Sequence, residues 1–574
     1  MPVHNRDIAE IFNHIADLLE LKGDNQFRIR SYRNAARTVE SMSRNVADMV
    51  DEGEDLSSLQ GIGKDLAGKI EKIVRREKID LLEKLKKEVP EELTELLKIG
   101  GLGPKKLKKI YDELGIKNMD ELKEAIDARK IRELEGFGKK TEETIQKEIT
   151  RLGESGNRFS IATAEEMAAS LMEYLGEGKG VENLEIAGSF RRRKETVGDI
   201  DILAVCKKDN DLMERFTGYE DVERVVSKGE ARSTVILRSG LQVDVRVFEK
   251  KSYGAAMHYF TGSKEHNVAM RKMAQKQDLK INEYGVFSGE KMIAGKTEEE
   301  IYDHFSLEYI EPELRENRGE IDAAASGKLP KLVELDDIRG DLHTHTDATD
   351  GRMSLKEMAE GARNMGYEYM AVTDHSKRVT VAGGMDVKEV RKQLDKIDRL
   401  NEEYDEFRLL KGIEVDILED GSLDLPDELL KELDLCVCAV HYKFNLSREK
   451  QTERIIRAMG NRYFTILAHP TGRMIGERDP YELDMEKILN AAGENECFIE
   501  LSAHPKRLDL VDYHCKQAKE MGVKVAISTD SHSTGGLENM KYGIGQARRG
   551  WLEKDDVLNT MSLDDLVKVV KKKR

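Results

Sequence analysis

Aspartates spaced for metal binding give the strongest chemical signal in this chain. Residues 198–205 read GDIDILAV, so that apolar residues alternate with Asp199 and Asp201. Because successive side chains of a β-strand point to opposite faces, this spacing predicts that both carboxylates project from one face. A second predicted strand, residues 241–248, places Asp244 in the same alternating pattern. Three carboxylates on neighbouring strands suit a pair of divalent cations that activate an attacking hydroxyl and stabilise a leaving pyrophosphate.

Residues that could bind a phosphate group precede the first of these strands. Gly188 would let the backbone approach a phosphate closely, and Ser189 and Arg192 can donate hydrogen bonds to its oxygens. The alternative is an ordinary surface strand with acidic residues beside a solvated run of arginine and lysine. The combination of this loop with three strand carboxylates favours nucleotidyl transfer.

Two further segments, residues 259–263 (YFTGS) and 281–284 (INEY), follow downstream. Together with the loop and the aspartates, they resemble the DNA polymerase X family, of which polymerase beta is the best-known member. The resemblance implies that the catalytic residues Asp199, Asp201 and Asp244 hold two Mg²⁺ ions. It also implies these nucleotide contacts: Gly188, Ser189, Arg192, Tyr259, Phe260, Gly262, Asn267 and Arg271.

One position departs from the family pattern. Polymerase beta has a further triphosphate-binding arginine before its Glu-Glu-Met, and the simplest alignment gives Ile161 at that position. An isoleucine cannot donate to a phosphate, so the departure predicts weaker nucleotide affinity.

Three turns in the amino-terminal third resemble helix-hairpin-helix repeats. Residues 59–64, 99–104 and 134–139 each read apolar-Gly-apolar-Gly before a predicted helix, with lysines following. The backbone N–H groups of such a turn, with the helix N-terminus, bind a DNA phosphate without reading bases. A single turn also fits an ordinary helical hairpin, but three before a polymerase-like palm favour DNA binding. The predicted DNA contacts are Tyr32, Gly61, Gly63, Lys64, Gly101, Gly103, Lys105, Gly136, Gly138 and Lys139.

The first repeat lies in a region that resembles the family's 5′-end-binding domain. Residues 30–36 match its 5′-phosphate motif, and Lys69 falls at the position of the Schiff-base lysine of the deoxyribose-phosphate lyase. A second family lysine is replaced by Asp65, whose charge opposes the lowered pKa that such a nucleophile needs. An ordinary phosphate-binding lysine is therefore the favoured interpretation of Lys69.

Histidines and carboxylates recur after residue 335, mostly behind short apolar runs. These runs alternate with helical patterns, which predicts strand–helix units around a parallel barrel with polar residues converging on one mouth. The pattern resembles the PHP phosphoesterase family. The resemblance implies up to three Mn²⁺ or Zn²⁺ ions held by His343, His345, Asp350, His375, Glu414, His441, His469, Asp530 and His532.

Length and composition agree with a multidomain chain: 574 residues with 39% hydrophobic content supply several cores. The expected fold is helical helix-hairpin-helix domains, an α/β nucleotidyltransferase palm with a thumb, and a distorted (β/α)7 PHP barrel. The expected bounds are 1–85 for the lyase-like domain, 90–155 for the fingers, 158–250 for the palm, 251–320 for the thumb, 321–334 for a linker and 335–574 for the PHP domain.

The net charge of −17 is unusual for a DNA-binding protein, although most of the acidic excess follows residue 300. Local basic turns must therefore attract the DNA backbone. Five cysteines form neither a disulfide framework nor a zinc-ribbon spacing, and no apolar signal segment or membrane span is found. A cytoplasmic location is expected.

The predicted function is that of a family X DNA polymerase that fills short gaps during DNA repair. Its PHP domain would supply a metal-dependent 3′-5′ exonuclease or 3′-end phosphoesterase activity. The expected partners are gapped or nicked double-stranded DNA and dNTPs, with no membrane. The sequence does not determine the oligomeric state, and a monomer is favoured. Two alternatives stay open: a DNA-end-binding scaffold with a vestigial metal site, and a template-independent nucleotidyltransferase. The intact ligand set argues against the first, and residues 259–263 with Asn267 and Arg271 argue against the second.

Overall fold

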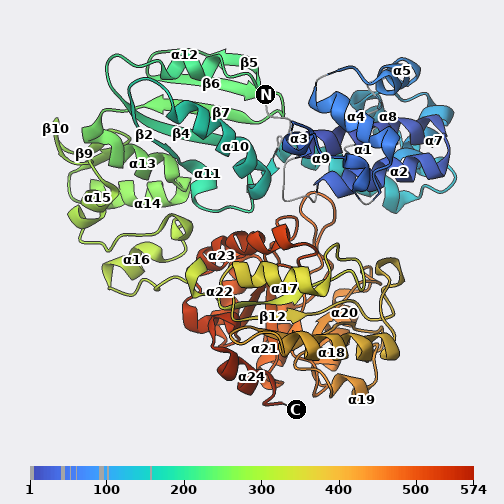
Figure 1. Ribbon diagram of the computed structural model, residues 1–574. Coiled ribbons are helices and arrows are strands. Elements are labelled where there is room, and N and C mark those ends of the chain that lie inside the picture. The colour runs from blue at the N-terminus through green and yellow to red at the C-terminus, as the bar shows by residue number, and fades with distance from the viewer. Residues whose placement is uncertain are drawn as a thin grey trace. The chain divides into compact units, whose positions relative to one another are not determined.

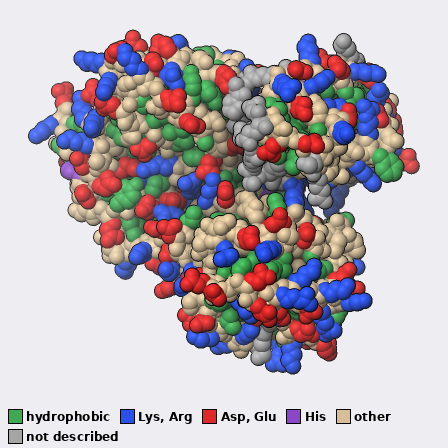
Figure 2. Space-filling view, in the orientation of Figure 1, with side chains coloured by type: hydrophobic (Ala, Val, Ile, Leu, Met, Phe, Trp, Pro, Cys, Tyr) green, Lys and Arg blue, Asp and Glu red, His purple; other side chains and the backbone are tan. Residues whose placement is uncertain are grey.

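The computed structural model describes residues 5–40, 46–51, 53–59, 61–75, 77–89, 93, 96–97, 99, 102–155 and 158–573. The chain divides into two compact units, Met1–Asn157 and Arg158–Arg574 (Figure 1). Among the described residues, no helix is both long and apolar enough to cross a lipid bilayer. On the face shown in Figure 2, basic and acidic side chains are interspersed over each unit, which fits local rather than global attraction of a polyanion.

The first unit is helical. Its helices are α1 (Asn5–Lys22), α2 (Gln26–Glu40), α3 (Val46–Asp51), α4 (Lys64–Val74), α5 (Asp80–Glu88), α7 (Pro104–Leu114), α8 (Met119–Asp127) and α9 (Lys139–Ser155), with 3-10 turns Leu56–Ser58 and Ile131–Glu133. Amphipathic spacing explains the packing, because α4 buries Leu66, Ala67, Ile70 and Ile73 along one stripe. These side chains belong to a hydrophobic core that extends through the unit.

Glycine makes the predicted hairpin turns possible. Gly61 and Gly136 have φ of 77° and 83°, a left-handed conformation that favours glycine. Gly63 and Gly103 are the N-cap residues of α4 and α7, so each helix begins directly after its turn. Gly101, another predicted DNA contact, lies outside the described residues.

A five-stranded sheet forms the palm in the second unit. Its strands are β2 (Val181–Ile186), β4 (Asp199–Cys206), β7 (Gln242–Val247), β6 (Arg232–Leu237) and β5 (Val222–Ser227), in that spatial order. Of these described strands, only β4 and β7 pair in parallel. A short ladder of β1 (Phe159–Ser160) with β3 (Thr196–Val197) lies beside the sheet. The palm helices are α10 (Ile161–Gly176), α11 (Gly188–Arg191) and α12 (Leu212–Thr217).

The thumb follows with a small antiparallel sheet and its own core. Its elements are α13 (Tyr253–Thr261), α14 (Lys264–Gln275), β8 (Lys280–Asn282), β9 (Gly285–Ser288), β10 (Lys291–Ala294), α15 (Glu298–His304) and α16 (Glu320–Ala325), with 3-10 turns Lys250–Ser252 and Pro312–Leu314. A buried ion pair of Arg315 with Glu298 fixes the end of the thumb against α15.

The carboxy-terminal part is a parallel barrel. Its strands are β11 (Gly340–Thr344), β12 (Tyr369–Val372), β13 (Arg408–Lys411), β14 (Glu414–Asp416), β15 (Val437–Ala439), β16 (Ile466–Leu467), β17 (Phe498–Ser502) and β18 (Val525–Ser528). Since β13 and β14 are separated by two residues and pair with opposite neighbours, they act as one interrupted strand of seven. Parallel bridges from His375 to Glu414 and from Thr344 to Ser531 join the two sheets on both sides.

Side-chain alternation divides the barrel into two cores. Tyr369 and Ala371 of β12 belong to the inner cluster, whereas Met370 and Val372 belong to the cluster beneath the outer helices. The helices are α17 (Leu355–Asn364), α18 (Val387–Asn401), α19 (Asp427–Leu430), α20 (Arg448–Met459), α21 (Met485–Glu494), α22 (Asp512–Glu520), α23 (Met540–Arg549) and α24 (Leu563–Val570), with 3-10 turns Leu335–Asp337, Thr380–Ala382, Thr534–Asn539, Lys554–Asp556 and Leu558–Thr560. The fold class predicted from the sequence is confirmed.

Candidate active sites

The palm brings its three predicted aspartates together on one face of the sheet. Asp201 of β4 is the direct neighbour of Asp244 on the parallel strand β7, and Asp199 lies two residues earlier on β4. Asp244 is buried and accepts hydrogen bonds from Thr234 Oγ1 at 2.7 Å and Gln242 Nε2 at 2.8 Å. Period-two alternation thus produces the predicted carboxylate cluster.

Crowding of negative charge marks this cluster as a cation site. Burial, together with the charges of Asp199 and Asp244, raises the pKa of Asp201 to about 7. Gly188, the first residue of the short helix α11, closes the cluster: its φ is 68°, and a Cβ atom there would lie 3.0 Å from Asp201 Oδ2. A side chain at position 188 would therefore fill the space beside the carboxylates, which explains the need for glycine.

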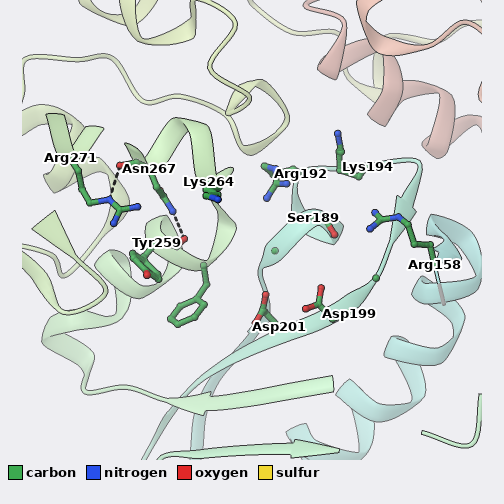
Figure 3. A pocket seen from close by; sticks show the side chains of 14 residues that line it. Arg158, Ser189, Arg192, Lys194, Asp199, Asp201, Tyr259, Lys264, Asn267 and Arg271 are labelled. Carbon is green, nitrogen blue, oxygen red and sulfur yellow. Dashed lines mark hydrogen bonds between the residues drawn. The ribbon is translucent and has the colours of Figure 1, made fainter. Parts of the chain in front are cut away.

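A cavity of about 530 Å³ opens beside Asp199 and Asp201 (Figure 3). All eight predicted nucleotide contacts line it, namely Gly188, Ser189, Arg192, Tyr259, Phe260, Gly262, Asn267 and Arg271. Asn267 Nδ2 donates to the Tyr259 backbone oxygen at 2.7 Å, and Arg271 Nε donates to the Asn267 backbone oxygen at 3.2 Å. These bonds fix the α13–α14 side of the cavity, opposite the aspartates and Ser189 (Figure 3).

Sequence reasoning missed three cationic side chains that line the same cavity: Arg158, Lys194 and Lys264. Antiparallel pairing of Phe159 with Val197 places Arg158 opposite Gly198. Arg158 Nη2 donates to the Thr196 backbone oxygen at 2.7 Å, and a Cβ atom at Gly198 would lie 3.3 Å from Arg158 Nη1. The structure thus supplies a guanidinium from a position three residues before Ile161. The only signal in the sequence was that an arginine stands at the start of the predicted palm, residues 158–250.

The barrel mouth gathers all nine predicted PHP ligands. Potential ligand atoms fall into three groups, each with its atoms within 4.8 Å of one another: His345, Asp350, His375 and His532; His343, His345 and Asp530; and His375, Glu414 and His441. Glu414 lies at the centre, and His469 Nε2 is 2.9 Å from its Oε1. Each ligand stands at or just beyond the carboxyl end of a barrel strand, with two exceptions: Asp350 lies in the loop after β11, and Glu414 begins β14 directly after the interruption that follows β13.

Buried carboxylates orient several of these imidazoles, and the sequence analysis did not identify them. Glu500 Oε1 lies 2.7 Å from His343 Nδ1, and its Oε2 accepts from the His469 backbone N–H at 2.5 Å. Asp416 Oδ1 lies 2.5 Å from His441 Nδ1. Such contacts fix the tautomer and direct the other ring nitrogen at a metal. A charged residue inside the apolar strand β17 was the available signal, because a wholly buried glutamate needs a partner.

The donor set fits divalent cations. His343 Nε2, both ring nitrogens of His345 and Glu414 Oε2 are buried without a hydrogen-bond partner among the described residues. Unsatisfied polar atoms at this density are costly, and metal coordination would satisfy them. Arg507 Nε lies 3.3 Å from Asp530 Oδ2, so a guanidinium also faces the cluster. Mixed imidazole and carboxylate donors around a cation suit hydrolysis of a phosphate ester.

The lyase-like site is less complete. Lys69 forms an ion pair with Asp65, one helical turn earlier on α4, and its Nζ is 5.8 Å from the centre of the Tyr32 ring. The Lys69 side chain is 15% exposed and that of Asp65 is 83% exposed. Tyr32 is itself buried, with its ring packed edge-on against Phe12. The carboxylate predicted to oppose lyase chemistry is thus in direct contact with the lysine.

Family comparisons match four parts of the chain. A helix-hairpin-helix domain matches residues 3–79, a SAM-like helix-hairpin-helix tandem matches 77–151, a polymerase beta thumb matches 256–316 and a PHP domain matches 341–504.

Comparison with individual proteins extends the similarity over the whole chain. The DNA polymerase/3′-5′ exonuclease PolX of Bacillus subtilis (strain 168) is 39% identical over 574 residues, which cover 99% of this chain and 100% of that protein. A probable phosphatase of Thermoanaerobacter sp. (strain X514) is 32% identical over 231 residues, 38% of this chain and 89% of its own length. A likeness that spans both full lengths, together with the palm and barrel geometry, shows that the chain belongs to the family X DNA polymerases that carry a PHP domain.

Proposed function

We propose that this chain is a template-directed DNA polymerase that fills short gaps in DNA, with a metal-dependent 3′-5′ exonuclease in its PHP domain. The observation that carries the polymerase assignment is the cavity itself, because carboxylates and phosphate donors meet on one side of it. On its other side, Asn267 and Arg271 are held where a base pair would lie. The resemblance of residues 259–263, Asn267 and Arg271 to the base-pair segment of the polymerase family favours a templated enzyme over a template-independent transferase.

Within the palm, Asp199, Asp201 and Asp244 would hold two Mg²⁺ ions, which supply activation of the primer 3′-hydroxyl and neutralisation of the leaving pyrophosphate. Ser189, Arg192 and the backbone at Gly188 bind the triphosphate, and Arg158 adds a charge-assisted donor beside Gly198. Tyr259, Phe260 and Gly262 support the incoming sugar. Because Arg158 takes the place of the arginine that the alignment lacks at position 161, we propose that nucleotide affinity is not reduced by Ile161.

In the barrel, the nine ligands would hold Mn²⁺ or Zn²⁺, which supplies a hydroxide nucleophile at neutral pH. Glu500 and Asp416 keep the ligand imidazoles in position. Arg507 faces the same mouth and binds the non-bridging oxygens of the scissile phosphate. The intact ligand set and its buried supporting carboxylates argue against a vestigial site.

The amino-terminal unit binds DNA through its hairpin turns. We propose that it holds the 5′ side of a gap, with Lys69 as a phosphate-binding residue, and that the enzyme acts as a monomer on gapped or nicked DNA and dNTPs. The finer domain bounds and a cytoplasmic location stay predictions from the sequence.

Primer extension on a one-nucleotide gap, compared with a single-stranded primer that has no template, tests the polymerase assignment. We expect template-matched incorporation on the gap and little extension without a template. Equal extension of both substrates would favour the transferase, and no extension with Mg²⁺ or Mn²⁺ would favour the scaffold.

A further inference from the structure

A chain of ion pairs connects the barrel helix α23 with the nucleotide cavity of the palm. Glu316 Oε1 accepts from Arg192 Nε at 3.1 Å and from Arg549 Nη1 at 2.9 Å. Arg549 Nη1 also donates to the Arg192 backbone oxygen at 2.8 Å, and Arg549 Nη2 donates to Asp512 Oδ2 at 2.6 Å. All these contacts lie within the second compact unit. A single guanidinium of the PHP domain therefore contacts the phosphate-binding loop and the end of the thumb.

These side chains are withdrawn from water. The exposed fraction is 12% for Arg192 and Glu316, 11% for Asp512 and 2% for Arg549. Burial acts against ionisation of Glu316, but Arg549, Arg192 and Lys194 outweigh it and hold its pKa below the usual value. The carboxylate thus stays charged at neutral pH, and removal of one partner would leave a buried charge uncompensated.

The contacts fix the orientation of Arg192. Its Nη1 donates to the Thr261 backbone oxygen while its Nε is held by Glu316, so two sides of the planar guanidinium are occupied. Arg192 nevertheless lines the cavity beside Ser189 and Gly188 (Figure 3). An arginine held along two sides presents its remaining donors to a ligand at little cost in side-chain entropy.

We propose that Arg549 is a positioning residue of the polymerase reaction. Through Glu316, it holds Arg192 in the orientation that receives the triphosphate, so the PHP domain sets the nucleotide affinity of the palm. This inference rests on the proposed function of the cavity as a dNTP site. It assigns a role to the barrel that is independent of its own metal cluster.

The test is steady-state gap filling by the full chain with Arg549→Met. We expect KM for the dNTP to rise by about tenfold while kcat changes by less than about twofold, because the charge-assisted hydrogen bond that orients Arg192 through Glu316 is removed. Arg549→Lys should give an intermediate KM, since lysine keeps the charge but not the forked donors. Glu316→Gln should also raise KM. The variant that combines Arg549→Met with Glu316→Gln should show a smaller rise of KM than the product of the two single effects, because both changes break the same contact.

A neighbouring residue supplies the matched control. Arg548 lies on the same helix and donates to Glu313 Oε1 at 2.7 Å, with exposed fractions of 16% and 11%. Its partners among the described residues are Glu311, Glu313 and the Val333 backbone, none of which belongs to the chain of ion pairs. Arg548→Met should leave KM unchanged. An equal rise of KM in Arg548→Met would assign the effect to a loosened interface and overturn the proposal.

Two other results would also overturn it. They are an unchanged KM in Arg549→Met and a lowered KM in Glu316→Gln, which would show that the glutamate competes with the nucleotide. If Arg549→Met failed to fold by circular dichroism, Glu316→Gln would decide the question alone. An inactive wild-type enzyme would instead refute the polymerase assignment itself.

Discussion

Asp201 and Asp244 lie side by side as paired residues of β4 and β7, the only parallel pair among the described strands of the palm sheet. Parallel pairing brings two carboxylates from segments more than forty residues apart into one cluster, and Asp199 joins them from the same face. Repulsion within this cluster is relieved when cations bind, so the geometry is poised for metal.

The first prediction concerns that cluster. Asp201→Asn keeps the shape of the side chain but removes a metal-binding charge, and we expect kcat for incorporation to fall by about 10³-fold or more. DNA affinity measured by fluorescence anisotropy should change little, because the hairpin turns supply most phosphate contacts. Retention of normal incorporation would refute the assignment of Asp201 as a ligand.

The second prediction concerns Arg158. Arg158→Ala removes a charged donor from the cavity, and a charge-assisted hydrogen bond contributes about 1.5–3 kcal/mol. We therefore expect KM for the dNTP to rise by about 10- to 100-fold, with Arg158→Lys in between. Arg224→Ala, an exposed arginine on the edge strand β5, is the control and should leave KM unchanged. If Arg158→Ala left KM unchanged, as we expect for Arg224→Ala, Arg158 would serve only as a structural partner of Thr196.

These sites show what local sequence patterns can predict. The grouping of the three aspartates was predictable because strand periodicity fixes the direction of each side chain, whereas the nine PHP positions were predicted from the resemblance of their short motifs to a known family. Arg158 was missed because counting along the chain assigned Ile161 to the missing arginine, whereas the β1–β3 pairing brings an earlier residue to the cavity. No local pattern relates Glu316 to Arg549, since their contact depends on how the thumb and barrel pack.

Buried supporting residues were missed for a different reason. Glu500 lies in an apolar strand that any pattern would assign to a core, and its role depends on His343 from a strand far away in sequence. The palm strands and the parallel barrel, in contrast, were predictable because alternation and helical periodicity are local properties, and the family resemblance added the hairpin domains and the thumb.

The third prediction concerns DNA binding by the hairpin turns. Lys64 and Lys139 begin their helices, and Lys105 is the second residue of α7, so each lies beside a turn that can hold a phosphate. The triple change to alanine should weaken binding to unrelated DNA sequences alike. It should also reduce the log–log salt slope by about 0.9 for each phosphate that the variant no longer neutralises.

The matched control for that experiment is the triple alanine variant of Lys78, Lys123 and Lys130, three exposed lysines outside residues 59–64, 99–104 and 134–139. It removes the same charge and should lower the slope less. Equal slopes in the two variants would show that general charge, rather than the turns, attracts the DNA.

The fourth prediction concerns Lys69. The Asp65 carboxylate contacts the Lys69 amine directly and engages the nitrogen that would have to attack the sugar, so borohydride trapping of a 5′-deoxyribose phosphate adduct should be weak. Asp65→Asn removes the opposing charge and should increase the trapped adduct. Strong trapping by the wild-type chain that Lys69→Ala abolishes would show that the lyase is active despite Asp65.

The last prediction is that the barrel and palm activities separate. His343→Ala combined with His345→Ala removes ligands from two of the three groups, so the amount of bound Mn²⁺ measured by mass spectrometry should fall and Mn²⁺-stimulated 3′-5′ degradation of DNA should be lost. Gap filling should persist, because neither histidine contacts the palm in the described residues.

Glu500→Gln leaves every ligand in place but weakens the orientation of His343, so it should lower metal affinity by about 10- to 100-fold and regain activity at high Mn²⁺. Asp201→Asn is the reciprocal control and should keep full 3′ degradation. Degradation that survived in the double-histidine variant after chelation and defined Mn²⁺ addition would assign the nuclease to another site.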